Sequence, residues 1–214
     1  MKARIHQYKN LFSHKQFLVS LIISVFFLTL SIIINFYAGT YATEKASNSV
    51  TDIILSNIRV YDVDFYFIYG SFAFALISAI ISLFKPERLP FIIKSISLFV
   101  IIRSIFISLT HLGPFPTQII INSDILSKLS FGADLFFSGH TGMPFLLALI
   151  FWNDKFIRYI YLSFTLFFAV IVLMAHLHYS IDVLAAIFIT YTIFHIALHF
   201  FKKDRALFHY FENI

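Results

Sequence analysis

The chain has 214 residues, of which 59% are hydrophobic and 13% are charged, and its formal net charge is +5. Because soluble domains carry roughly 25% charged residues, this chain has too little polar surface to cover a water-soluble globule. The absence of cysteine excludes disulfides, thiolate metal sites and thiol catalysis. Sparse glycine and proline favour long apolar helices over the alternating strands of a transmembrane barrel.

Hydrophobic segments predict an all-α, polytopic membrane protein with six transmembrane helices in a single membrane domain, residues 1–214. In chain order the predicted helices are residues 17–38, 65–84, 90–112, 138–153, 157–176 and 180–201. Most approach the ~20 residues that cross a ~30 Å hydrocarbon core. The fourth is short, and we expect it to extend into the apolar run Phe131–Phe137. The first follows a basic leader, but it is too long for a signal peptide, so we expect an uncleaved helix.

The lysines and arginines between the helices predict the orientation of the chain. With a cytoplasmic N-terminus, the outer side carries only Lys45, Arg59 and Lys128. The inner side then carries Lys2, Arg4, Lys9, Lys15, Lys85, Arg88, Lys155, Arg158, Lys202, Lys203 and Arg205. We therefore predict that both termini are cytoplasmic. Topology explains most of the excess positive charge, so no nucleic-acid partner is expected. Two long outer loops, 39–64 and 112–137, remain, and Val50–Ser56 is interpreted as a short interfacial helix.

A histidine and an aspartate stand one helical turn apart where the sixth helix begins, in the sequence HYSID from His178 to Asp182. Side chains at i and i+4 share a helix face, so Asp182 can accept a hydrogen bond from one ring nitrogen of His178. The other nitrogen is then left to act as a nucleophile. The alternative is a buried structural pair. Ionisable groups near a membrane are costly and tend to be functional, which favours the catalytic interpretation.

A second motif, FSGHTG from Phe137 to Gly142, precedes the fourth helix. Helix N-termini present unpaired backbone N–H groups to an anion. Gly139 permits close approach of the backbone, Ser138 and Thr141 add hydroxyls, and His140 stands in the first turn. The alternative is an ordinary serine N-cap with an incidental histidine. Because the fourth and fifth helices form a hairpin, both motifs are expected at the outer face, where they would supply a nucleophile, an orienting group and a general acid.

Together these motifs resemble the type 2 phosphatidic acid phosphatase superfamily, and most closely its sphingomyelin synthase-like branch. The stretch Gly132–Thr141 reads GADLFFSGHT, against a Gly-Asp-x-x-x-Ser-Gly-His-Thr type motif, and Ala175–Asp182 reads AHLHYSID, against Ala-His-x-His-Tyr-Thr-x-Asp. A third segment, THLGPFP at Thr110–Pro116, follows Arg103 and resembles Thr-x-Leu-Pro-x-Pro with one residue inserted. The resemblance covers residues 103–201.

The chain departs from the superfamily's phosphatases at two cationic elements. Their Lys-x6-Arg-Pro element is missing, and Val172 stands six residues before His178 where a Ser-Arg pair is usual. A phosphomonoester is nearly dianionic and benefits from several cations. A phosphodiester is monoanionic, so the missing cations favour a transferase of phosphorylated head groups.

The resemblance implies a role for each matched residue. His178 would attack phosphorus, Asp182 would orient it, and His140 would protonate the leaving oxygen and deprotonate the incoming hydroxyl. The implied contacts to the substrate come from Ser138, Gly139, Thr141, Arg103, Asp134 and Tyr179. It implies no cofactor and no metal, membrane lipids as donor and acceptor, and a site facing the periplasm, exterior or lumen. Hydrolysis of a lipid phosphate is the second hypothesis, and a non-catalytic transporter or assembly protein is the third.

Overall fold

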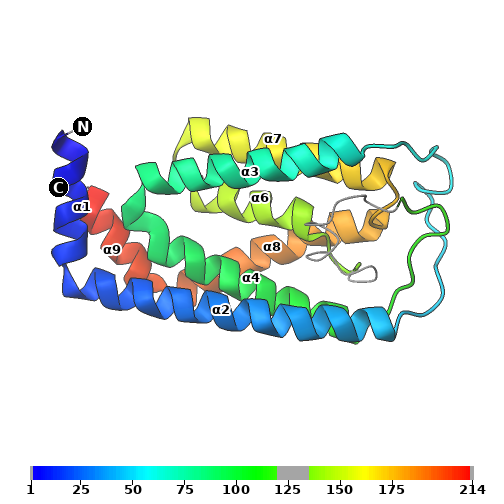
Figure 1. Ribbon diagram of the computed structural model, residues 1–214, viewed down its shortest axis with the longest axis horizontal. Coiled ribbons are helices and arrows are strands. Elements are labelled where there is room, and N and C mark those ends of the chain that lie inside the picture. Colours follow the sequence, from blue (N-terminus) through cyan, green and yellow to red (C-terminus); the bar gives the residue numbers. More distant parts are fainter. Residues whose placement is uncertain (1, 120–134, 213–214) are drawn as a thin grey trace.

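The computed structural model describes residues 2–119 and 135–212, and every regular element within them is helical (Figure 1). The all-α fold is therefore confirmed. The elements in chain order are α1 (Lys2–Ser13), α2 (Lys15–Glu44), α3 (Asp64–Phe84), the 3-10 turn η1 (Pro86–Arg88), α4 (Leu89–Leu109), α6 (Gly139–Ile150), α7 (Lys155–Met174), α8 (Ser180–Phe200) and α9 (Lys202–Glu212).

Within the described residues, five helices are long and apolar enough to cross a membrane, namely α2, α3, the segment that joins η1 to α4, α7 and α8. The predicted fourth span, α6, has 12 residues, or about 18 Å of helix. It does not extend toward residue 131, because Leu135–Ser138 is not helical and Ser138 caps the helix. The first span is longer than predicted, since its 30 residues continue to Glu44.

The spans lie side by side along one axis, with both chain termini at one end of the bundle and the loops before α3 and after α4 at the other (Figure 1). Helix α2 packs along α4, α6 lies between α7 and α8, and α3 packs on α7. Helix α4 is the most buried span, whereas α2 and α3 turn most of their residues outward. Apolar outward faces are what a lipid-solvated helix requires.

Short helix α6 begins inside the bundle and ends near the termini. At its C-terminal end, the guanidinium of Arg88 lies 5.0 Å from the centroid of the Phe151 ring. At its beginning, Gly139 lies against Arg103, which stands six residues before the end of α4. Six residues correspond to about 9 Å of helix. The N-terminus of α6 is therefore recessed below the loop end of the bundle.

The loop that was interpreted as an interfacial helix is a turn in the structure. The Asp52 carboxylate accepts hydrogen bonds from the backbone N–H groups of Ile54 and Leu55, at 2.8 and 3.0 Å. The N–H of Ser56 donates to the Asp52 carbonyl at 2.9 Å. Aspartate side chains commonly stabilise turns in this way, and here the turn replaces the predicted helix.

Candidate active site

The N-terminus of α6 is built by Ser138 and Thr141. Ser138 is the N-cap, and its hydroxyl oxygen accepts from the Thr141 N–H at 3.4 Å and from the Thr141 hydroxyl at 3.2 Å. Both side chains are completely buried. The ordinary capping role, which was the alternative interpretation, is thus realised. The backbone N–H groups of Gly139 and His140 have no acceptor within the helix, and they are the ones available to an anion.

Arg103 reaches this helix terminus from α4. Its Nε donates to the Phe137 carbonyl at 3.1 Å. The side chain passes so close to Gly139 that a Cβ built there would lie 3.3 Å from Nε. A positive guanidinium therefore lies beside the positive end of the α6 dipole, an arrangement that favours a negative ligand. Asp134, the other predicted neighbour, lies outside the described residues.

His140 stands in the first turn of α6 between two aromatic side chains. Its ring centroid lies 4.5 Å from that of Phe67 in α3 and 5.6 Å from that of Phe168 in α7. Arg103 lies against the preceding residue, Gly139, and His178 binds the carbonyl of Leu135, three residues before the N-cap Ser138. The two histidines therefore stand on adjoining segments, and the surroundings of His140 are largely apolar.

His178 lies just before α8, outside the helix, because Tyr179 is the N-cap. Its Nδ1 is 2.9 Å from the Leu135 carbonyl oxygen and 3.6 Å from Asp182 Oδ2. A carbonyl oxygen can only accept, so Nδ1 carries the hydrogen and Nε2 keeps the lone pair. The expectation that Asp182 accepts this hydrogen bond is corrected: Leu135 is the acceptor, and Asp182 stands at ion-pair distance.

Asp182 is completely buried. Its Oδ2 accepts from the Tyr179 N–H at 2.9 Å and so caps α8. Its Oδ1 has no hydrogen-bond partner among the residues that the structure describes. A buried carboxylate with spare acceptor capacity, 3.6 Å from an imidazole, stabilises positive charge that develops on that ring. The catalytic role of Asp182 stays a prediction.

Two contacts join the sequence motifs directly. The Ser138 N–H donates to the Asp182 carbonyl at 3.1 Å, and Leu135, three residues before Ser138, accepts from His178. The segment that leads into α6 therefore lies on the first turn of α8. Because these contacts involve backbone atoms, the residue types of the motifs did not predict them.

Tyr179 ties the outer loops to α8. Its hydroxyl donates to the Gly113 carbonyl at 2.8 Å and accepts from the Val50 N–H at 3.2 Å, and only 1% of its surface is exposed. The structure thus gives this side chain a scaffolding position. Its contact with substrate stays a prediction.

Asp52 is a residue near the site that the sequence analysis missed. Its second oxygen, Oδ2, accepts from the Ser180 N–H at 2.7 Å, in the first turn of α8. Burial raises the pKa of Asp52, but hydrogen bonds from the backbone N–H groups of Leu55, Ser180 and Ile54 outweigh it and hold the pKa below its usual value. The signal in the sequence was a single aspartate in a polar loop, and its partner lies 128 residues away.

Chemically, the arrangement combines a histidine of fixed tautomer, a second histidine nearby, a buried carboxylate and an anion cradle that consists of Arg103 and the start of α6. Those are the parts of a phosphoryl-transfer site that uses a histidine nucleophile. No group of three or more potential metal-binding side chains comes together in residues 2–119 and 135–212.

Comparison with known families gives one match. Residues 132–200 match the family model described as PAP2 superfamily C-terminal, and this segment contains both histidine motifs. The match supports the resemblance at the level of the phosphatidic acid phosphatase superfamily, and with it a phosphatase or phosphotransferase activity on phosphoesters. No curated protein and no solved structure matches the chain.

Proposed function

We propose that the protein is a membrane lipid phosphotransferase of the sphingomyelin synthase-like type, which moves a phosphorylated head group between lipids. The observation that carries the proposal is the setting of His178. Its Nδ1–H is bound by the Leu135 carbonyl, a buried carboxylate lies 3.6 Å from the same nitrogen, and Arg103 lies at the adjacent start of α6. That setting directs Nε2 to act as a nucleophile.

In the first step, Nε2 of His178 attacks the phosphorus of the donor lipid. The bond from phosphorus to the lipid oxygen breaks, and His140 gives its proton to that oxygen. In the second step, His140 takes the proton of the acceptor hydroxyl, whose oxygen attacks phosphorus as the N–P bond breaks. Each proton transfer typically contributes 10²–10⁴-fold to the rate. Arg103 and the N–H groups at the start of α6 would stabilise the negative charge on the phosphoryl oxygens.

Two features favour a lipid hydroxyl over water as acceptor. The site is recessed among apolar spans, and His140 packs against Phe67 and Phe168. A site that is poor in water protects a reactive phosphohistidine from hydrolysis. The superfamily's phosphatase cations are also missing from the sequence. Hydrolysis of a lipid phosphate remains the alternative, since its first step is the same.

The non-catalytic alternative predicts that His140 and His178 lie apart or face lipid. In the structure His178 is buried, and its ring binds the carbonyl of Leu135, in the segment that leads into the helix whose first turn holds His140. This proximity favours the catalytic proposal over a transporter or an assembly protein.

The decisive experiment uses the purified full chain in mixed micelles. The donors are phosphatidylcholine, phosphatidylethanolamine and phosphatidic acid with isotope-labelled head groups, and the acceptor is diacylglycerol with distinguishable acyl chains. Transfer yields a new phospholipid that carries the acceptor chains, whereas hydrolysis yields a free phosphate or phosphate ester. An acid-labile, alkali-stable phosphoenzyme should be trapped on the wild type.

His178→Gln should abolish the product and the phosphoenzyme, and Asp182→Asn should lower both. His199→Gln is the matched control, because His199 is an exposed histidine near the C-terminal end of α8. Full turnover by His178→Gln, or a phosphoenzyme on that variant, would overturn the mechanism. Release of free phosphate with no new lipid would replace transfer by hydrolysis.

We further propose that the histidine site faces the periplasm, exterior or lumen, as the lysine and arginine distribution predicts. Because the chain contains no cysteine, single substitutions report on each end of the bundle. Asn57→Cys lies in the loop before α3 and Asn153→Cys between α6 and α7, and both positions are exposed. In intact cells an impermeant maleimide should label Asn57→Cys alone, and labelling of Asn153→Cys alone would reverse the orientation.

A further inference from the structure

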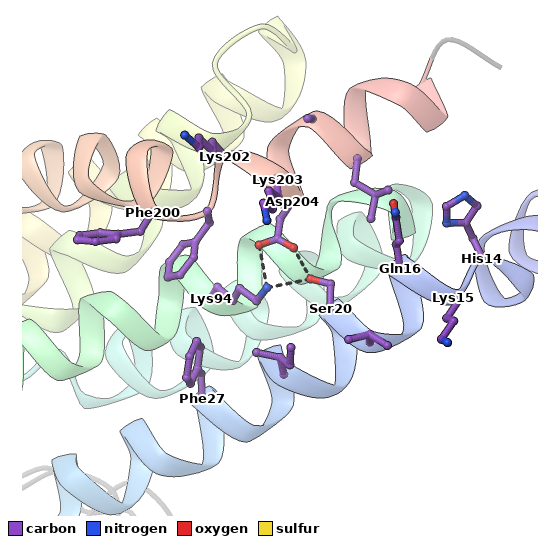
Figure 2. Close-up of a pocket in the computed structure, with 15 residues that line it drawn as sticks. His14, Lys15, Gln16, Ser20, Phe27, Lys94, Phe200, Lys202, Lys203 and Asp204 are labelled. Carbon is purple, nitrogen blue, oxygen red and sulfur yellow. Dashed lines mark hydrogen bonds and ion pairs between the residues drawn. The ribbon is translucent and has the colours of Figure 1, made fainter.

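A groove opens at one end of the bundle (Figure 2). Both chain termini lie at this end, opposite the histidine site (Figure 1). It has a volume of about 1160 Å³ and runs between the start of α2 and the turn that joins α8 to α9. Pockets for a single small ligand typically measure roughly 300–1,000 Å³. The groove therefore has room for a larger molecule, and the proposed phosphoryl transfer makes no use of it.

The polar base of the groove is a cluster of three side chains, of which Lys94 and Asp204 are buried and Ser20 is partly buried. Lys94 Nζ of α4 lies 2.8 Å from Asp204 Oδ2 of α9 and 2.9 Å from Ser20 Oγ of α2, and Ser20 also donates to Asp204. Figure 2 shows the three side chains pointing toward one another from three different helices. Because Asp204 neutralises Lys94, this pair contributes no net charge to the groove.

The net charge of the groove comes from its basic rim, which we define as Lys15, Lys202 and Lys203. All three side chains line the groove and are exposed. Among the described residues that line the groove, Asp204 is the one acidic side chain, and it is paired with Lys94. The rim is thus unbalanced, and a ligand with negative charge would complement it.

The walls of the groove are apolar. Val19, Ile23 and Phe27 contribute from α2, and Phe200 contributes from the end of α8. Val19, Ile23 and Phe200 are also exposed. These residues belong to helices long and apolar enough to cross a membrane. The walls therefore lie at the level of the lipid acyl chains, and the basic rim lies at the ends of the helices. A water-soluble anion would make no favourable contacts with these apolar walls.

We propose that this groove binds one anionic phospholipid. Its phosphate lies at the basic rim and its acyl chains run along the apolar walls. Basic pockets between membrane helices provide both interactions that such a lipid requires, since lysines attract the head group and apolar side chains solvate the chains. The bound lipid would join α2 to α8 and α9 at the position where the buried cluster also joins them.

The test is native mass spectrometry of the full chain in detergent with equal concentrations of dioleoylphosphatidylglycerol and dioleoylphosphatidylcholine. The wild type should retain one phosphatidylglycerol with at least about tenfold preference, because each lysine near an anionic head group contributes several-fold. The variant K15Q/K202Q/K203Q should lose that preference. The matched control, K9Q/K85Q/K155Q, removes three lysines outside the groove and should keep it.

A second variant tests the walls without changing the charge. Ile23→Trp fills the path of an acyl chain, so it should weaken retention of phosphatidylglycerol although the basic rim is intact. Replacing sodium chloride by inorganic phosphate at equal ionic strength should leave the bound lipid in place. Far-ultraviolet circular dichroism checks that each variant is folded.

Several results would overturn the proposal. These are equal retention of the two lipids by the wild type, equal losses in the rim and control variants, displacement of the lipid by inorganic phosphate, or a protein dimer that forms in place of the lipid complex. None of these measurements requires turnover. The lipid site therefore stands or falls separately from the phosphotransferase proposal.

Discussion

Two cations of α4 occupy opposite ends of the bundle and have different surroundings. Lys94 is paired with Asp204 across 2.8 Å, and both side chains are buried. Arg103, nine residues later and about 13 Å along the helix, donates its Nε to the Phe137 carbonyl beside the start of α6. One cation forms an ion pair with a carboxylate of its own chain, whereas the other lies against the start of a helix, where an anion can bind.

The difference separates a structural use of charge from a ligand-binding one. A buried ion pair satisfies its own charges and joins helices, so its loss should affect folding. A guanidinium next to the positive end of a helix is placed to stabilise a bound anion, so its loss should affect binding and catalysis. Variants of Lys94 should therefore mainly change stability, and variants of Arg103 should mainly change activity.

The largest effect is expected for Lys94→Met. This change leaves the buried carboxylate of Asp204 without its cation, and breaking such a pair costs about 3–5 kcal/mol. Thermal unfolding in detergent, followed by circular dichroism, measures the loss. The double variant Lys94→Met/Asp204→Leu should recover most of the stability. If the single variant were as stable as the wild type, the cluster would have no structural role.

Arg103→Gln should show the opposite pattern. Removal of one group that stabilises transition-state charge typically lowers turnover by about 10²–10³-fold. The free energy of unfolding should change by only about 1 kcal/mol, the scale of one hydrogen bond. Turnover per folded molecule, from the labelled-lipid assay, gives the first quantity, and thermal unfolding gives the second. Unchanged turnover would remove Arg103 from the anion cradle.

Two glycines in the first turn of α6 should also separate effects on stability from effects on activity. A Cβ at position 142 would lie 2.8 Å from both Phe99 and the Thr190 hydroxyl, whereas a Cβ at position 139 would lie 3.3 Å from the flexible Arg103 side chain. Gly142→Ala should therefore destabilise the protein by about 1–3 kcal/mol through overpacking. Gly139→Ala should lower turnover several-fold and leave the unfolding temperature nearly unchanged. A loss of stability in Gly139→Ala with none in Gly142→Ala would show that the closely packed glycine is Gly139.

The smallest effect is expected for Asp52→Asn, and it should depend on pH. The pKa of Asp52 is lowered in the fold, so its charge stabilises the protein above the unfolded value of about 3.9. At pH 7 the variant should be less stable by about 1 kcal/mol. As the pH falls through the folded pKa, the aspartate becomes protonated and the difference in unfolding temperature should vanish. A difference that grew on acidification would contradict this role.

Much of the site could be predicted because its chemistry is local in the sequence. His178 and Asp182 are four residues apart, and Ser138 stands at the start of a recognisable apolar run. Helical spacing and helix-start signals were therefore enough to single out these residues. The hydrogen-bond partner of His178 could not be predicted in the same way. Any residue can supply a carbonyl, so the role of Leu135 left no signal in the residue type.

The predicted start of the fourth span and the predicted helix in the loop before α3 were wrong, because local signals of similar strength competed there. The apolar run of the fourth span suggested an extension before Gly139, but the hydroxyl of Ser138 accepts from the Thr141 N–H and caps the helix there. Residues Val50–Ser56 were interpreted as an interfacial helix. In the structure the Asp52 carboxylate accepts from the N–H groups of Ile54, Leu55 and Ser180 and stabilises a turn. In both cases one polar side chain outweighed a hydrophobic pattern.

By itself the sequence determined that the chain is helical and apolar, where its spans lie, and that two histidine motifs stand at helix starts. Those properties depend on composition and on neighbours within a few residues. The tertiary structure alone decided that Leu135 binds His178, that Ser138 contacts the first turn of α8, that Asp52 caps this turn, and that Lys94 pairs with Asp204 at the base of the groove. Such contacts join residues far apart in the chain, and their geometry follows from the packing of whole helices.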